Sequence, residues 1–447
     1  MKSNYIMELG ALAKKNNNVL PSLYNKYEVK RGLRNSNGTG VLVGLTEIGD
    51  VHGYIMDENE KVPVNGRLRY RGIDVDDISN GFISDGRFGF EEVIYLLLFG
   101  ELPGKTELEK FNGLLGLSRD LPDNFLEDMI LKAPSNDIMN KLARSVLILY
   151  SYDENPDDTS VVNIIRQSTE LIARFPAMMA YGYQAKAYHY MNKSLVIHTP
   201  DPELSTAENL LKMSRVSGEY SKIEAELLDL MLVLHAEHGG GNNSAFTAHV
   251  VSSSGTDIYS AIAAAVGSLK GPRHGGANVR VNRMMKEIKT NVKDWSSDRE
   301  VSAYLEKILR KNAFDRSGLI YGIGHAVYTK SDPRSVILKE KASELAKATG
   351  KEEEFNLYKS IEKLAPVVFK EVKKNDKDLC ANVDFYSGFV YEMMGIPKDL
   401  FTPLFAASRI AGWCSHIAEE YINGGRIIRP AYKNIINASD YIPLSKR

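Results

Sequence analysis

The sequence of 447 residues contains only two cysteines, Cys380 and Cys414. Two thiols cannot form a disulfide framework, and neither has a CxxC partner or the ligand spacing of a metal site. We therefore expect both to be buried thiols, in a protein of a reducing compartment.

Long apolar runs are also missing. No segment approaches the roughly 20 apolar residues of a membrane-spanning helix. The N-terminal stretch MKSNYIMELGALAKKNNNVLP has neither a sustained apolar region nor an arginine, so it predicts neither a secretory signal nor a transit peptide. The expectation is a cytoplasmic protein without a membrane partner.

Neither basic nor acidic residues are in excess, and the formal net charge is −1. Nucleic-acid-binding proteins usually carry a basic excess or stripe, so no nucleic-acid partner is expected. The charge-rich stretches 351–354 and 370–378 are interpreted as solvated helix faces. Apolar residues make up 43% of the chain, which is typical of a globular protein.

Helical periodicity dominates the chain from residue 91 onward. Apolar residues recur at helical spacing, and no alternation of strands with helices indicates a doubly wound sheet. Before this region, the β-branched runs 41–45 and 51–55 predict a small strand-containing flap. The sequence thus predicts a large, mostly α-helical protein. Expected helices cover 91–99 (ending at Gly100), 137–150, 162–181, 223–238, 258–269, 300–311, 335–348, 355–373, 385–394 and 403–422.

His274 stands in the segment GPRHGGAN. We expect Gly271 and Pro272 to end the preceding helix, Gly271 because it tolerates a left-handed φ and Pro272 because it cannot continue a helix. Gly275 and Gly276 follow the histidine and let a ligand approach the backbone closely. A titratable ring in this setting indicates a functional site.

His235 and His238 are three residues apart in LHAEH, one helical turn, as two metal ligands would be. The pattern is neither HExxH nor HxxEH, and no fitting third ligand follows downstream. Two satisfied histidines at a helix C-terminus are the favoured interpretation. A metal-dependent hydrolase built on His235, His238 and His274 is a distant alternative.

Three further places carry groups capable of chemistry. His325 follows a glycine-rich turn, and both a hydrogen-bonded turn histidine and a functional histidine remain open. Asp384 directly precedes an apolar helical run, which favours an N-cap over a general base. Arg409 lies among apolar residues and needs an anion, either an internal carboxylate or a substrate.

Taken together, these motifs resemble those of the citrate synthase family. LHAEH, GPRHGGAN, GIGHAVY with DPR, NVDFYSG, SRIAGW and a final RP occur in that family's order and at similar spacing, over nearly the whole chain. The resemblance implies an all-α two-domain fold with minor β structure near the N-terminus. Residues 1–275 would form the large domain with its flap, 276–394 the small domain, and 395–447 a return to the large domain with a C-terminal arm.

The resemblance also implies an acyltransferase of the Si-citrate synthase type, which condenses acetyl-CoA with oxaloacetate and hydrolyses citryl-CoA, without a metal or a cofactor. His274 would hydrogen-bond the acetyl-CoA carbonyl as the enolate forms, Asp384 would remove the methyl proton, and His325 would donate to the ketone oxygen of oxaloacetate. The active unit would be a homodimer with shared sites. The implied oxaloacetate shell is His238, Arg334, Arg409 and, from the other subunit, Arg429; the implied CoA-binding residues are Gly322, Ile323, Gly324 and Lys330.

A 2-methylcitrate synthase acting on propionyl-CoA is the nearest alternative, because one methylene is worth only about 1–3 kcal/mol of discrimination. A non-catalytic helical scaffold is disfavoured, because it has no use for the three catalytic groups. Two positions depart from the family pattern. Gly239 stands where a Glu or similar residue usually follows LHAEH, and Thr329, beside Lys330, stands where some members carry an arginine that meets CoA phosphate.

Overall fold

The computed structural model describes residues 2–17, 19–35, 37–58, 60–376 and 378–447. The chain divides into two units, Met1–Leu45 and Thr46–Arg447. The first unit contains the helices α1 (Lys2–Asn16) and α2 (Pro21–Lys26) and the short 3-10 helix η1 (Arg31–Leu33). The predicted strand at 41–45 was wrong: these residues are irregular, and Leu42 and Leu45 are exposed. A β-branched run forms a strand only where a neighbouring strand pairs with it.

The second unit begins with a small antiparallel sheet of β1 (Gly49–Asp57), β2 (Glu60–Tyr70) and β3 (Ile73–Asp74), in the order β1-β2-β3. β1 confirms the strand expected at 51–55. The register between β1 and β2 shifts at Gly53. A Cβ atom at Gly53 would lie 2.8 Å from the carbonyl oxygen of Val327, so glycine lets the hairpin approach the loop that follows His325. The N–H of Gly66 donates to Ser331 Oγ of the same loop at 3.1 Å.

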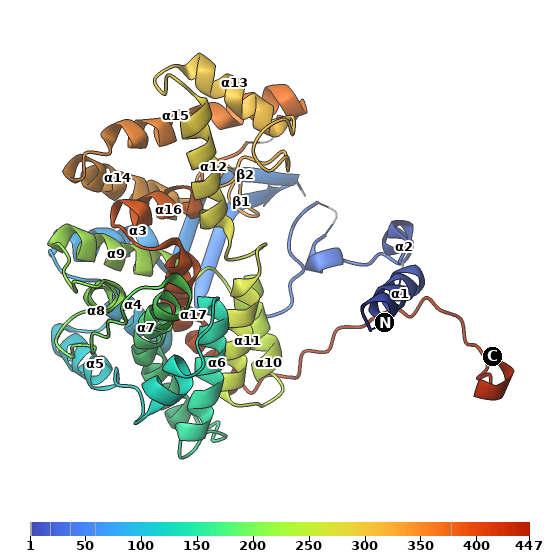
Figure 1. Ribbon diagram of the computed structural model, residues 1–447, viewed down its shortest axis with the longest axis horizontal. Helices are drawn as coiled ribbons and strands as arrows, with labels where there is room; N and C mark the ends of the chain where they lie inside the picture. The colour runs from blue at the N-terminus through green and yellow to red at the C-terminus, as the bar shows by residue number, and fades with distance from the viewer. Residues whose placement is uncertain (1, 18, 36, 59, 377) are drawn as a thin grey trace. The chain divides into compact units, whose positions relative to one another are not determined.

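The remainder of the second unit is helical, as predicted (Figure 1). None of the helices in the described part of the chain combines the length and apolar character needed to cross a bilayer. The α-helices are α3 (Val75–Ser84), α4 (Phe90–Phe99), α5 (Lys105–Leu117), α6 (Ile138–Leu149), α7 (Val161–Met191), α8 (Thr206–Ser214), α9 (Lys222–His235), α10 (Asn243–Ser252), α11 (Ile258–Lys270), α12 (Ala277–Asn291), α13 (Asp298–Leu309), α14 (Pro333–Ala348), α15 (Glu352–Lys373), α16 (Val383–Met393) and α17 (Phe401–Ile422). Short π or 3-10 segments are η2 (Leu126–Leu131), η3 (Tyr150–Tyr152), η4 (Lys398–Leu400) and η5 (Leu444–Lys446).

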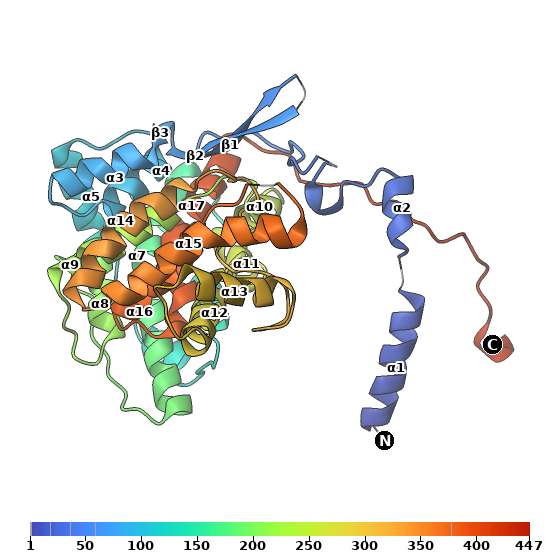
Figure 2. The same ribbon diagram turned by 90° about the horizontal axis from the view of Figure 1, so that it is seen from above.

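Helix α17 lies at the centre of this unit and packs against α4, α7, α9, α10 and α11 (Figure 1). Its residues are buried without interruption from Pro403 to Ala418, and Trp413 is fully buried. A helix that is apolar on all faces is stable only inside a core. Arg409 is therefore carried into the interior by the helix on which it lies. Helices α12 to α16 pack mainly on one another, and Figure 2 shows α13 and α15 side by side.

Two helix ends differ from the sequence expectation. α9 ends at His235, so His238 lies beyond the helix and the two histidines are not one helical turn apart. The chain instead turns through Gly239, whose φ is +81°. α11 ends at Lys270 as expected, but Gly271 has a φ of −57° and a ψ of 133°, not a left-handed conformation. The ring of Pro272 explains this, because it forces the preceding residue into extended geometry.

Candidate active site

The loop that carries His325 is joined to the segment that precedes α16. The N–H of Gly324 donates to Cys380 O at 2.7 Å, and the N–H of Asn382 donates to Gly322 O at 2.9 Å. Gly322 and Gly324 have φ values of +82° and +100°, a region that favours glycine. A Cβ atom at Gly322 would also lie 2.8 Å from the Phe385 side chain. The glycines therefore permit the close contact that holds His325 near the start of α16.

The ring of His325 is fixed in one tautomer by its own turn. Its Nδ1 accepts hydrogen bonds from the backbone N–H groups of Val327 and Tyr328, both at 3.1 Å. A nitrogen that accepts carries no proton, so the neutral ring has its proton on Nε2. The ring also stacks on Tyr328, with the centroids 4.8 Å apart. His325 is thus a hydrogen-bonded turn histidine and, by the same contacts, an oriented Nε2–H donor.

Asp384 does not cap its helix, and the favoured sequence interpretation was wrong. Asn382 is the N-cap of α16, and its Oδ1 accepts the backbone N–H of Asp384 at 3.0 Å. Burial raises the pKa of Asp384 to about 6, against the opposing charges of Arg334 and Arg409. A carboxylate whose pKa lies near neutrality is suited to accept a proton at physiological pH.

Arg334 is held by the aspartate two residues before it. Asp332 caps α14, with Pro333 in the first turn. Its carboxylate accepts from Arg334 Nε at 3.0 Å and from Nη2 at 2.8 Å, and both side chains are buried. Asp332 Oδ2 also accepts the N–H of Val383 at 3.3 Å. This bidentate pair fixes the guanidinium next to the start of α16.

Arg409 has an incomplete set of partners. Its Nε donates to the backbone carbonyl of His235 at 2.7 Å, and its guanidinium lies 4.8 Å from the ring centre of Phe405. Among the described residues, Nη1 and Nη2 are buried without a hydrogen-bond partner. Burial lowers the pKa of Arg409 to about 10, so the group is still charged at pH 7. A buried cation with unused donors is costly unless an anion meets it, which favours an anion from outside the chain.

His274 and Arg409 both lie against the ring of Phe405. The rings of His274 and Phe405 are 6.3 Å apart, and His274 Nε2 lies 3.1 Å from Ser244 Oγ. Burial, with Arg409 as a second cause, lowers the pKa of His274 to about 4. The ring is therefore neutral at pH 7. It precedes the N-terminus of α12.

His238 completes a group of rings around Tyr328. Its ring centre lies 5.2 Å from that of His325 and 5.6 Å from that of Tyr328. Burial, and then the charge of Arg334, lower its pKa well below the usual range. Within the described part of the chain, its buried Nε2 has no hydrogen-bond partner. A neutral ring with an unused buried polar atom fits a ligand-binding role.

Not every expected residue joins this group. Arg429 is exposed and lies beyond the end of α17, and Lys330 is exposed while Thr329 is half-buried. The three-histidine metal site of the hydrolase alternative is not formed: His235 directs Nδ1 to Met231 O at 2.8 Å, inside its own helix. Gly239 suits its turn, since a Cβ atom there would lie 3.1 Å from the side chain of Val51.

Sequence reasoning did not identify several residues that shape the site. Asp332 and Asn382 could have been found, because an Asp before Pro and an Asn before an apolar run are helix-start signals. Ser244, Tyr328 and Phe405 carry no such local signal, because their roles depend on contacts across the fold.

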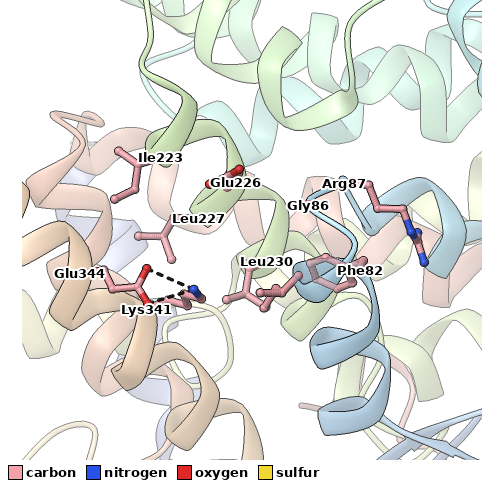
Figure 3. A pocket seen from close by; sticks show the side chains of 10 residues that line it. Phe82, Gly86, Arg87, Ile223, Glu226, Leu227, Leu230, Lys341 and Glu344 are labelled. Carbon is pink, nitrogen blue, oxygen red and sulfur yellow. Dashed lines mark hydrogen bonds and ion pairs between the residues drawn. The ribbon is translucent and has the colours of Figure 1, made fainter.

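A pocket of about 150 Å³ lies elsewhere, between α3, α9 and α14 (Figure 3). Lys341 and Glu344 form an ion pair at its wall, with Nζ and Oε1 3.0 Å apart. The described residues that line it include none of the candidate site residues.

Comparison with known proteins places this arrangement in a family. Residues 36–431 match the family model described as citrate synthase, C-terminal domain. The citrate synthase of Haloferax volcanii is 34% identical over 426 residues, 94% of this chain and 99% of that protein. The 2-methylcitrate synthase 1 of Corynebacterium glutamicum is 32% identical over 429 residues, again 94% and 99% of the two chains.

A solved structure of a citrate synthase has a similar fold. The ternary complex of carboxymethyl coenzyme A and oxaloacetate with citrate synthase from Thermoplasma acidophilum superposes with a TM-score of 0.75 at 26% identity, covering 94% of this chain and 99% of that chain. The mostly helical fold with its small N-terminal sheet is thus shared. The chain belongs to the citrate synthase family of acyltransferases.

Proposed function

We propose that the protein is a citrate synthase, which condenses acetyl-CoA with oxaloacetate and hydrolyses the citryl-CoA intermediate to citrate and CoA. The observation that carries this proposal is the buried guanidinium of Arg409, whose two Nη groups find no partner among the described residues. Its charge acts on Asp384, a half-buried residue whose carboxyl pKa is raised to about 6. A substrate carboxylate and a carbon acid are the complements of these two groups.

Oxaloacetate supplies the missing anion. One carboxylate accepts from the Nη groups of Arg409 in the bidentate geometry that guanidinium favours. Arg334 and the unused Nε2 of His238 are the other groups of this chain proposed to bind oxaloacetate. The Nε2–H of His325 donates to the ketone oxygen and makes the carbonyl carbon electrophilic. The Thermoplasma acidophilum relative holds the same oxaloacetate in its complex.

Enolisation of acetyl-CoA requires a base and a donor. Asp384 takes a proton from the methyl group, and His274 donates to the thioester oxygen as negative charge develops there. Trp413 Nε1–H can only donate, so Ser244 Oγ accepts it at 3.1 Å. The hydroxyl proton of Ser244 then has two acceptors within reach, Asn242 Oδ1 at 3.0 Å and His274 Nε2 at 3.1 Å. Donation to His274 Nε2 leaves the Nδ1–H of that ring for the thioester.

Condensation joins the enolate carbon to the ketone carbon of oxaloacetate. The ketone oxygen becomes an alkoxide and takes a proton from His325, and water then cleaves the thioester C–S bond to release CoA as the thiol. The loop Gly322–Gly324 with Lys330 is the proposed contact for CoA. Residues 276–394 form the proposed small domain, which closes over residues 1–275 and 395–447 and excludes water until condensation is complete.

The proposed active unit is a cytoplasmic homodimer. Arg429 lies in the exposed segment after α17, outside the group formed by Arg334 and Arg409. In a symmetric dimer this segment can reach the oxaloacetate site of the other subunit.

Initial rates of CoA thiol release, with oxaloacetate and either acetyl-CoA or propionyl-CoA, test the proposal. We expect kcat/KM to favour acetyl-CoA by about 10–200-fold, the range set by one methylene. The 32% identical 2-methylcitrate synthase makes propionyl-CoA the specific competitor. Equal or greater kcat/KM with propionyl-CoA would assign the protein to that activity, and no thiol release with either substrate would refute the proposal.

A further inference from the structure

A second group of titratable side chains joins α10 to α17, outside the proposed catalytic residues. His249 Nε2, from α10, lies 3.2 Å from His416 Nδ1, from α17. Glu419 Oε2, one turn further along α17, lies 3.8 Å from His416 Nδ1. These three atoms all lie within 4.8 Å of one another. Two imidazole nitrogens and a carboxylate oxygen therefore face the same small space.

The far nitrogen of each histidine lies within ion-pair distance of a carboxylate. His249 Nδ1 pairs with Glu420 Oε2 at 3.1 Å. His416 Nε2 pairs with Glu237 Oε1 at 3.1 Å, and both of these side chains are fully buried. A histidine that binds a metal commonly donates its other ring N–H to a carboxylate, which fixes the tautomer and directs the free lone pair at the ion. His249 has that arrangement, and His416 Nε2 has Glu237 Oε1 at ion-pair distance. The near nitrogens of the two rings share a hydrogen bond, which an ion bound between them would replace.

The carboxylate in the group is also only half used. Glu419 Oε1 accepts the backbone N–H of Glu47 at 2.7 Å. Glu419 Oε2 is buried and finds no hydrogen-bond partner among the residues that the structure describes. A buried carboxylate oxygen without a partner is costly, so a cation or donor at this position is expected.

The spacing of the atoms fits one ion class. Tetrahedral Zn²⁺ with ligands at about 2.0–2.1 Å separates neighbouring ligand atoms by about 3.3 Å. The two separations recorded here, 3.2 Å and 3.8 Å, lie around that value. Imidazole and carboxylate ligands without thiolate suit Zn²⁺ and its neighbours Co²⁺ and Ni²⁺.

The charge around the group favours a cation. The carboxylates of Glu237, Glu419 and Glu420 act on the two rings. Two arginines oppose them: Arg409 acts on Glu237, and Arg71 interacts with Glu419. Burial disfavours a charged His416, but Glu237 and Glu419 outweigh burial and raise the pKa of His416 to about 9. A proton on His416 is therefore the competing occupant of the same negative site.

We propose that His249, His416 and Glu419 bind one Zn²⁺-class ion, with water as the fourth ligand and with Glu420 and Glu237 orienting the two histidines. The ion cross-links α10 and α17. Through His416 it also holds Glu237, the residue between Ala236 and His238 in the turn that bears the proposed oxaloacetate ligand. The site takes no part in the condensation chemistry. Its existence does not depend on the identity of the acyl substrate.

The test uses the full-length protein, stripped with a chelator, and ZnCl₂ alone as the probe. We expect about one Zn²⁺ per chain retained after gel filtration, a Tm that rises with Zn²⁺ concentration, and tetrahedral visible bands when Co²⁺ replaces Zn²⁺. His249→Gln should abolish all three signals. Glu420→Gln should weaken Zn²⁺ binding about 10–100-fold without removing a ligand. His189→Gln, at an exposed histidine on α7, is the matched control and should bind like the wild type.

His416→Gln removes a buried partner of Glu237 and can disturb the fold, so the result rests on His249→Gln and Glu420→Gln. Failure of the stripped wild type to retain Zn²⁺, with no change in Tm, would show that the site holds a proton and would overturn the proposal. Zn²⁺ binding that survives His249→Gln would overturn it equally, because the ion would then lie elsewhere.

Discussion

Asn382 Oδ1 accepts the backbone N–H of Asp384 at 3.0 Å, so the residue two positions earlier performs the capping that Asp384 would otherwise perform. The carboxylate of Asp384 is thereby released from a structural role at the start of α16. Asp384 is half-buried, Arg334 and Arg409 act on it electrostatically, and burial raises its pKa to about 6. Asn382 thus supplies the helix cap and leaves Asp384 available for the proton transfer proposed above, so substitutions at the two positions can separate the two roles.

Arg409→Met should leave the unfolding temperature of the ligand-free protein unchanged or higher, because it removes a buried charge with two unused donors. The same change should raise KM for oxaloacetate roughly 100-fold or more, the loss of two charge-assisted hydrogen bonds. Thermal unfolding and steady-state kinetics measure the two effects. A strongly lowered Tm with an unchanged KM would mean that Arg409 is a structural residue.

Ser244→Ala should lower kcat about 10-fold, the value of one well-placed hydrogen bond, and leave KM for oxaloacetate nearly unchanged. The reason is that, in the proposed mechanism, Ser244 sets the tautomer with which His274 donates to the thioester. Ser252→Ala is the matched control on the same helix, because its buried hydroxyl donates to Ala248 O at 2.8 Å and has no contact with His274. Equal losses of kcat in the two variants would refute the tautomer argument.

The fall of kcat/KM at acid pH should follow the ionisation of Asp384 and not that of His274. Asp384 must be ionised to act as a base, so kcat/KM should fall as pH drops below about 6, the raised pKa of this carboxyl. The pKa of His274 is lowered to about 4, so its ring is neutral over the whole range above pH 5. A profile of log kcat/KM against pH, recorded with substrates that dissociate faster than they react, measures the pKa of the base. An acid limb centred near pH 4 would mean that Asp384 is not the base.

Arg429→Ala and Asp384→Asn should complement each other in a mixed dimer. If Arg429 serves the partner's site, one site of the heterodimer carries both lesions and the other carries neither. Reassembled heterodimers, verified by affinity tags on both chains, should then show about half of wild-type activity per dimer. Heterodimers as inactive as the two parents would place Arg429 within its own chain's site.

Much of the fold could be predicted from the sequence because its helices carry strong apolar periodicity. The helix at 403–422 was expected within two residues of α17 (Phe401–Ile422), and the expected helix at 258–269 within one residue of α11 (Ile258–Lys270). The N-terminal helix α1 was not expected, because it is rich in polar residues. A helix with few apolar residues has a weak periodic signal, so the sequence alone does not indicate it.

The site was harder to predict, because its decisive contacts join residues far apart in the sequence. The end of α9 at His235 depends on the turn that buries Glu237, and Glu237 is paired with His416 on α17. That ion pair engages Oε1 of Glu237, the carboxylate whose charge also acts on Arg409. Whether Arg409 has an internal partner therefore could not be decided from its local sequence.

The most direct test of the proposed mechanism is exchange of the methyl protons of acetyl-CoA into D₂O, in the presence of a dicarboxylate that occupies the oxaloacetate site but cannot be attacked. The wild type should exchange these protons, and Asp384→Asn should do so roughly 10²–10⁴-fold more slowly, the usual value of a positioned base. The variant should keep a Tm at pH 7 equal to or above that of the wild type, because Asn382 still caps α16 and the cost of ionising a partly buried carboxyl is removed. Exchange at the wild-type rate in folded Asp384→Asn would contradict the account.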